Sequence, residues 1–147
     1  MTIDPMKVWA GMSIRTWPER NWMVDLDADR GEAALAAMAG SRARYCCLIR
    51  DQAGPSLVVD DETWREHGAG VPERDRFGPF KVVSTDGELP FDVIGFIRPV
   101  LQELNGAGIK AGPQCGAVFD HLFIYEKDIA RAEAMIADFI ARAKALP

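Results

Sequence analysis

Two short segments of the chain carry residues that could bind a small zwitterion. Residues 90–95 (PFDVIG) precede an expected helix, and residues 119–121 (FDH) begin an expected strand. A helix that begins near Gly95 would leave backbone N–H groups unpaired and carry a partial positive charge, which suits a ligand carboxylate. Asp120 could then bind an ammonium group, so that the two segments together would match a free amino acid. The spacing fits equally well a structure in which Asp92 caps the helix and Asp120 pairs with an exposed Lys or Arg.

Nucleophilic catalysis would need a thiol or hydroxyl beside an orienting base. Cys115 and His121 are the pair near enough in sequence to be considered. The sequence does not define which way these two side chains face, and an exposed thiol among glycines is more often incidental. We therefore rank an enzyme that uses Cys115 third, behind a binding module and an adaptor protein, and we expect no catalytic residues.

The remaining motif-like patterns predict neither a metal nor a cofactor. The two histidines are not spaced for zinc with a cysteine or with each other. The alternating carboxylates of residues 25–29 (DLDAD) resemble a calcium loop, but Arg30 and Ala36 occupy the positions of its glycine and its closing glutamate. The glycines of residues 106–112 follow an expected helix, whereas those of a dinucleotide-binding turn follow a strand.

Length and charge limit the classes of protein to which the chain can belong. Its 147 residues, 48% of them hydrophobic and 27% charged, predict one compact domain or two small subdomains. The 17 Lys and Arg against 22 Asp and Glu give a net charge of −5, which argues against a nucleic-acid partner. No apolar run approaches the roughly 20 residues that span a bilayer, and the start of the chain does not look like a secretory signal. We therefore expect a cytoplasmic protein that does not bind a membrane, with its three cysteines reduced and mostly buried.

Apolar patterns and turn residues predict the secondary structure that positions these segments. The first half predicts a hairpin over residues 8–26, a helix capped by Asp29 and ending at Gly40, a hairpin of strands 44–50 and 56–60, and a helix over 61–67. Residues 71–78 (VPERDRFG) are polar and contain Pro and Gly, so we expect them to link the two halves.

The second half predicts the same order of elements. It contains a strand over 80–85, a helix that ends at Gly106, a strand over 118–125 and a last helix capped by Asp128. The first of these helices begins just before Pro99 or is kinked there. The duplicated order predicts an α+β protein of two ferredoxin-like subdomains, residues 1–72 and 73–147, with helices covering antiparallel sheets.

The second half also resembles a known family. Residues 87–109 (GELPFDVIGFIRPVLQELNGAGI) and 119–132 (FDHLFIYEKDIARA) are similar to the tandem ACT domain proteins of the CASTOR type, and a weaker likeness covers residues 22–64. A departure is residues 110–116 (KAGPQCG), which stand where the family has a regular strand. We expect Pro113 and the glycines to bulge or break that strand.

The resemblance implies a regulatory protein that senses a small molecule, with an amino acid bound between ACT units. By position, Gly95 matches the family's loop glycine and Asp120 the acidic residue beside its ligand. Val93 and Ile94 fall on the loop that lines the family's pocket. The full set of candidate ligand-binding residues is Phe91, Asp92, Val93, Ile94, Gly95, Phe119, Asp120 and His121.

Two expectations about function follow from this resemblance. The first is a non-catalytic sensor that forms a homodimer, because ACT-like units associate through sheet edges or helices and unpaired edges need cover. The alternative is an interaction or structural adaptor that has kept the fold and lost the ligand.

Overall fold

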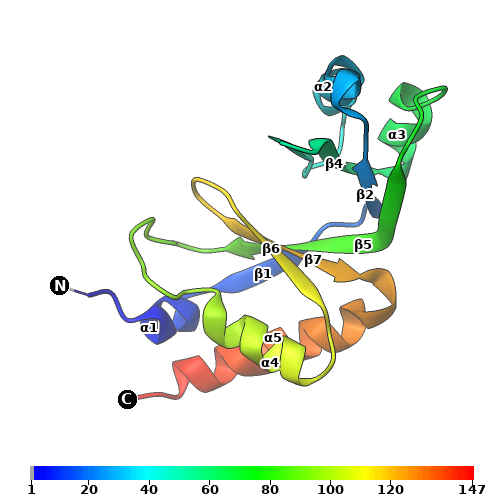
Figure 1. Ribbon diagram of the computed structural model, residues 1–147. Helices are drawn as coiled ribbons and strands as arrows, with labels where there is room; N and C mark the ends of the chain where they lie inside the picture. The colour runs from blue at the N-terminus through cyan, green and yellow to red at the C-terminus, as the bar shows by residue number, and fades with distance from the viewer. Residues whose placement is uncertain (1) are drawn as a thin grey trace. The chain divides into compact units, whose positions relative to one another are not determined.

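The computed structural model describes residues 2–147, which form two compact units (Figure 1). The central unit is Trp17–Lys81. The terminal unit consists of the chain up to Thr16 together with Val82–Pro147. Among the described residues, no helix is both long and apolar enough to cross a membrane.

The central unit is a complete ferredoxin-like βαββαβ motif. In chain order its elements are β2 (Asn21–Asp25), the 3-10 turn η1 (Ala28–Arg30), α2 (Gly31–Gly40), β3 (Cys47–Asp51), β4 (Gly54–Asp60), α3 (Asp61–His67) and the first part of β5 (Asp75–Asp86). The strand order is β3-β4-β2-β5, and each of these pairs is antiparallel. Its core contains Val24, Leu57 and Val59 from the sheet, Ala34 and Ala37 from α2, and Trp64 from α3.

The terminal unit has the same architecture but takes one strand from the start of the chain. Its elements are α1 (Pro5–Ala10), β1 (Ser13–Thr16), the second part of β5, α4 (Arg98–Gly106), β6 (Ala111–Cys115), β7 (Asp120–Tyr125), η2 (Glu126–Asp128) and α5 (Ile129–Lys144). The strand order is β1-β5-β7-β6. Within residues 2–147 the position of a last strand is taken by β1, which pairs antiparallel with β5 from Ser13 opposite Asp86 to Thr16 opposite Val83. The α+β class and the ferredoxin-like fold are as predicted.

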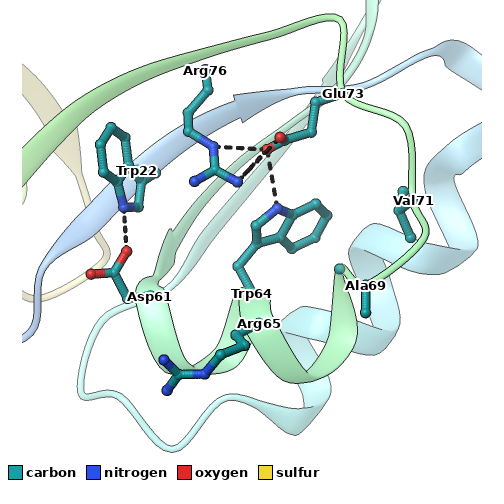
Figure 2. A pocket seen from close by; sticks show the side chains of 9 residues that line it. Trp22, Asp61, Trp64, Arg65, Ala69, Val71, Glu73 and Arg76 are labelled. Atoms are coloured by element: carbon teal, nitrogen blue, oxygen red, sulfur yellow. Dashed lines mark hydrogen bonds and ion pairs between the residues drawn. The ribbon is translucent and has the colours of Figure 1, made fainter.

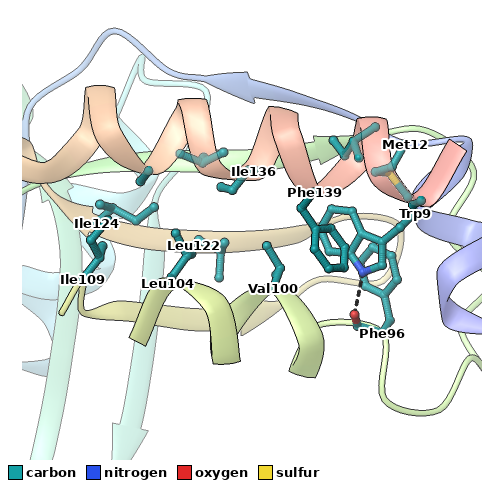
Figure 3. Close-up of a cluster of buried hydrophobic side chains, with 14 residues drawn as sticks. Trp9, Met12, Phe96, Val100, Leu104, Ile109, Leu122, Ile124, Ile136 and Phe139 are labelled. Carbon is teal, nitrogen blue, oxygen red and sulfur yellow. Dashed lines mark hydrogen bonds between the residues drawn. The ribbon is translucent and has the colours of Figure 1, made fainter. Parts of the chain in front are cut away.

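The core of the terminal unit lies between its sheet and the helices α4 and α5 (Figure 3). Leu104, Ile136 and Ile124 are fully buried there. Trp9 of α1 stacks on Phe96 with ring centroids 4.3 Å apart and meets Phe139 of α5 edge-on at 5.3 Å. Its indole N–H donates to the Phe96 carbonyl oxygen at 2.7 Å. The first helix is therefore part of this core.

Three expectations about the chain's organisation differ from the structure. The predicted hairpin over 8–26 is wrong, because β1 pairs with β5 whereas β2 pairs with β4 and β5. Part of its first run is instead helix α1, which Asp4 caps by accepting from the Met6 N–H and in which Pro5 stands at the first position. The linker predicted over 71–78 is also wrong from Asp75 on, where β5 begins.

The division into units also differs from the expected boundary between residues 72 and 73. The chain passes from the central to the terminal unit inside β5, between Lys81 and Val82. The polar residues at the start of β5 are part of a strand because they form backbone hydrogen bonds with β2. The second part of the same strand pairs with β1, so the strand continues from one unit into the other.

The other elements agree with the predictions to within a few residues. The β3–β4 hairpin, α3, β7 and α5 are confirmed. Helix α4 begins just before Pro99, the first of the two alternatives, since proline is tolerated in the first turn. The expected break at Pro113 is wrong, because β6 runs through it as an edge strand paired with β7. The cysteines are free as predicted, but Cys46 and Cys47 are half-buried and Cys115 is exposed.

Candidate functional site

A cavity of about 350 Å³ lies in the terminal unit, between the loop that joins β5 to α4 and the turn that joins β6 to β7. Four of the eight predicted residues line it, namely Phe91, Val93, Gly95 and Asp120. The other four, Asp92, Ile94, Phe119 and His121, are not among its lining residues. The two segments singled out in the sequence thus meet at one cavity, although only half of the predicted residues line it.

The loop is shaped by one glycine and one buried aromatic residue. Gly95 has a φ of +75°, a conformation that favours glycine. Phe96, next to it, is buried against Trp9 and also lines the cavity. Phe91 has the opposite character, with 83% of its surface exposed at the mouth. One side of the cavity is therefore anchored in the core.

The start of α4 supplies a positive charge that sequence reasoning missed. The helix begins at Arg98 and not near Gly95, and Arg98 is one of the residues that line the cavity. The preceding residue, Ile97, has no side chain that could cap the helix. The alternative in which Asp92 caps this helix is therefore wrong, because Ile97 and not Asp92 stands at the cap position. A cation in the first turn of a helix opposes the helix dipole, and this unusual placement was the signal that could have pointed to Arg98.

Asp120, the first residue of β7, is the acidic residue of the lining. Its backbone N–H donates to Thr85 Oγ1 at 3.0 Å, which fixes the start of β7 against β5. Among residues 2–147 its carboxylate forms no ion pair, so the alternative of a surface Lys or Arg partner is not realised. The cavity wall thus carries one guanidinium and one carboxylate, and the rest is mostly apolar.

Cys115 also lines the cavity, opposite Asp120 in the strand ladder. Burial raises the pKa of its thiol, and the nearby Asp120 carboxylate raises it further. A thiol with a raised pKa stays protonated at neutral pH and is a weak nucleophile. The site therefore lacks the activated thiolate that a Cys115-dependent reaction would need.

His121 does not serve as a base for Cys115. In the ladder Cys115 pairs with Asp120 and His121 pairs with Gln114, so the two side chains point to opposite faces of the sheet. His121 instead forms a hydrogen bond between its Nδ1 and Ser84 Oγ at 2.7 Å. Among the described residues, no group of three or more His, Cys, Asp or Glu side chains could hold a metal ion.

The buried setting of His121 predicts a pH dependence of stability. Burial lowers its pKa below the ordinary 6.5, and the opposing effect of the Asp120 carboxylate is smaller. The unfolded chain then binds a proton that the folded chain resists, so the free energy of unfolding should fall as the pH drops through 6.5 and level off below the folded pKa. Urea unfolding at pH 7.5 and 5.5 measures this fall. In His121→Asn the fall should be smaller than in the unchanged protein; an equal fall in both would contradict the prediction.

Comparisons with known proteins place the fold but not the family. No family model and no curated protein matches this sequence. Among solved structures, a protein of unknown function from Vibrio cholerae, described as a possible transport protein, is similar with a TM-score of 0.68 and 17% identity over 92% of this chain and 94% of that one. The regulatory subunit of aspartate kinase from Thermus flavus has a TM-score of 0.59 and 11% identity over 88% and 96%.

A whole aspartate kinase shows the same likeness in part of its length. The enzyme from Clostridium acetobutylicum has a TM-score of 0.67 and 12% identity over 87% of this chain, which spans 34% of that longer protein. At these identities the likeness concerns the fold alone. The likeness to the aspartate kinase and to the regulatory subunit supports an ACT-type fold for this chain.

Proposed function

We propose that the protein is a non-catalytic regulatory sensor that binds a free α-amino acid in the cavity of the terminal unit. The observation that carries the proposal is the pair of opposite charges on the cavity wall, Arg98 and Asp120, in an otherwise mostly apolar lining. A guanidinium suits the α-carboxylate and a carboxylate suits the α-ammonium group. The similarity to regulatory subunits of aspartate kinase and the resemblance to CASTOR-type ACT proteins support a regulatory role.

The loop between β2 and α2 of the central unit corresponds to the loop between β5 and α4 of the terminal unit, but it is less suited to bind a ligand. It is short, running only from Asp25 to Gly31. The carboxylates beside it already have a cation, because Arg74 lies 2.7 Å from Asp25 and 3.8 Å from Asp27. The longer loop between β5 and α4 is therefore the better candidate for a ligand.

Thermal unfolding with a panel of the twenty common amino acids tests the proposal. A ligand at 100 times its Kd stabilises the folded state by about 2.7 kcal/mol, so the midpoint of unfolding should rise clearly with at least one of them. Asp120→Asn and Arg98→Gln should each remove most of that rise, because each leaves one charge of the bound zwitterion unpaired.

Asp92→Asn is the matched control. It removes an exposed carboxylate from the same loop, but one that does not line the cavity, and it should leave the rise unchanged. A panel without any rise would instead favour the adaptor, which keeps the fold without the ligand. A rise that survives Asp120→Asn and Arg98→Gln would place the ligand elsewhere.

The proposal includes a cytoplasmic homodimer. The sheet of the terminal unit has edge strands β1 and β6, and an uncovered edge tends to pair with another chain. Light scattering coupled to size-exclusion chromatography would measure the mass, which is 16.2 kDa for one chain and should be twice that for the dimer.

A further inference from the structure

The central unit contains a second cavity, of about 490 Å³, that is distinct from the site above (Figure 2). Its lining residues come from β2, from α3, from the segment after α3 and from the start of β5. This volume lies within the range of small-molecule sites. Its walls combine two tryptophans with four charged side chains.

The two tryptophans form aromatic walls whose polar atoms are already satisfied. The Trp22 indole N–H donates to the Asp61 carboxylate, and the Trp64 indole N–H donates to Glu73 Oε1 at 3.1 Å. Trp64 is buried and packs in the core of the unit, and Trp22 is half-buried at the edge of that core. These bonds fix the rings and leave no free N–H donor for a ligand. The guanidinium groups of Arg20 and Arg76 lie 5.7 Å and 5.2 Å from the centre of the Trp22 ring, so a ligand would contact the part of the indole surface that they leave uncovered.

Two of the four charges neutralise each other. Arg76 donates to Glu73 from Nε at 2.9 Å and from Nη2 at 3.1 Å, and its guanidinium lies 5.2 Å from the centre of the Trp22 ring. Glu73 thus binds Arg76 and Trp64 together. This pair stabilises the cavity wall and leaves no net charge for a ligand.

The other two charges, Asp61 and Arg65, lack an ionic partner. They stand four residues apart on α3, a spacing that often gives an ion pair. Yet within residues 2–147 neither has an oppositely charged group within 4.0 Å, and Asp61 accepts its side-chain hydrogen bond from the uncharged Trp22 indole. A ligand that carries one positive and one negative charge would supply the ionic partners that Asp61 and Arg65 lack.

We infer that this cavity binds a small zwitterion with a planar aromatic body, of which an aromatic α-amino acid is the simplest example. Asp61 would bind the ammonium group and Arg65 the carboxylate, while the ring packs against Trp22 and Trp64. A simple anion would meet the unpaired Asp61, and a simple cation would meet the unpaired Arg65. The balanced charges therefore favour a zwitterion over either.

Titration with L-phenylalanine tests the inference, because phenylalanine does not absorb at the wavelength that excites tryptophan alone. We expect a saturable change in tryptophan fluorescence with the full chain. The titration is carried out with the Asp120→Asn variant, in which the proposed site of the terminal unit is disabled. Any binding then reports on the cavity of the central unit alone, and its absence would leave the proposed function untouched. 3-Phenylpropanoate and phenethylamine, which each lack one charge, should bind at least about tenfold more weakly.

Two variants locate the binding. Asp61→Asn keeps an oxygen that accepts from Trp22 but loses the charge, and Arg65→Gln loses the cation; each should weaken phenylalanine binding by about tenfold or more. Arg50→Gln, which removes an exposed arginine of the same unit away from the cavity, should leave it unchanged. Circular dichroism confirms that each variant is folded.

Three results would overturn the inference. One is the absence of any saturable change up to 10 mM phenylalanine, at roughly the weak end of small-ligand affinity. Another is binding that Asp61→Asn and Arg65→Gln leave intact. The third is 3-phenylpropanoate binding as tightly as phenylalanine, which would make the cavity an anion site.

Discussion

Replacing Trp9 by alanine is expected to lower the free energy of unfolding by about 3–5 kcal/mol. Trp9 is 1% exposed, stacks on Phe96 and meets Phe139 edge-on. The substitution removes this buried ring and leaves the Phe96 carbonyl without its indole donor. Urea unfolding followed by circular dichroism measures the loss.

Two further variants make the Trp9 experiment specific. Trp9→Phe keeps an aromatic ring but removes the donor, and it should cost about 1–3 kcal/mol. Phe91→Ala changes an exposed aromatic residue of the same unit and should have almost no effect on stability. If Trp9→Ala were as mild as Phe91→Ala, the first helix would not belong to the core of the terminal unit.

The same substitution should also disturb the proposed ligand site. Trp9 holds Phe96, and Phe96 is a wall of the cavity that contains Arg98 and Asp120. At a temperature where Trp9→Ala is still folded, the stabilisation by an amino acid should therefore be smaller than in the unchanged protein. An undiminished stabilisation would show that the loop keeps its shape without Trp9.

Gly68→Ala is expected to destabilise the central unit by about 1–3 kcal/mol. A Cβ at this position would lie 2.4 Å from two atoms of the Trp64 ring and 2.7 Å from the Trp64 carbonyl oxygen. Neither can move easily, since the ring is buried in the core and the oxygen accepts the Gly68 N–H that ends α3. Gly68 has a φ of −93°, which other residues also adopt, so the cost is one of packing.

Gly106→Ala separates that packing cost from the general effect of replacing glycine. A Cβ at Gly106, at the end of α4, would have nothing within 4 Å. The change should stabilise the protein by about 0.4–1 kcal/mol, because alanine restricts the unfolded chain. Urea unfolding of the two variants should thus give shifts of opposite sign. Shifts of the same sign and size would contradict the crowding at Gly68.

Local patterns in the sequence were enough to predict most elements and to single out the two segments that meet at the cavity of the terminal unit. The apolar stripe of α5, the alternation in β7 and the turn residues between β3 and β4 each act over a few neighbouring residues. The same holds for Gly95, whose positive φ fits its place in a tight loop. For these elements the structure agrees with the predictions.

The missed features depend on residues far apart in the chain. The sequence predicts a hairpin strand for residues 8–16, whereas the first three of them belong to α1, which packs on α5, and Ser13–Thr16 form β1, which pairs with β5. The Arg98 side chain could be assigned to the cavity only once the start of α4 was known to lie after Gly95. The cavity around Trp22 and Trp64 joins residues of β2 with residues about 40 to 50 positions later.

By itself the sequence determined the fold class, the type and approximate position of most elements, and the two segments that hold Phe91 and Asp120, because short-range periodicity and turn chemistry set these. The tertiary structure alone decided that β1 completes the sheet of the terminal unit, that Cys115 and His121 face apart, and that Arg98 and Asp120 line the same cavity. These outcomes depend on which strands pair and in what register, as when Ser13 meets Asp86 at a separation of 73 residues. Register and long-range pairing are chosen by the burial of both partners together, and neither partner's local sequence contains that information.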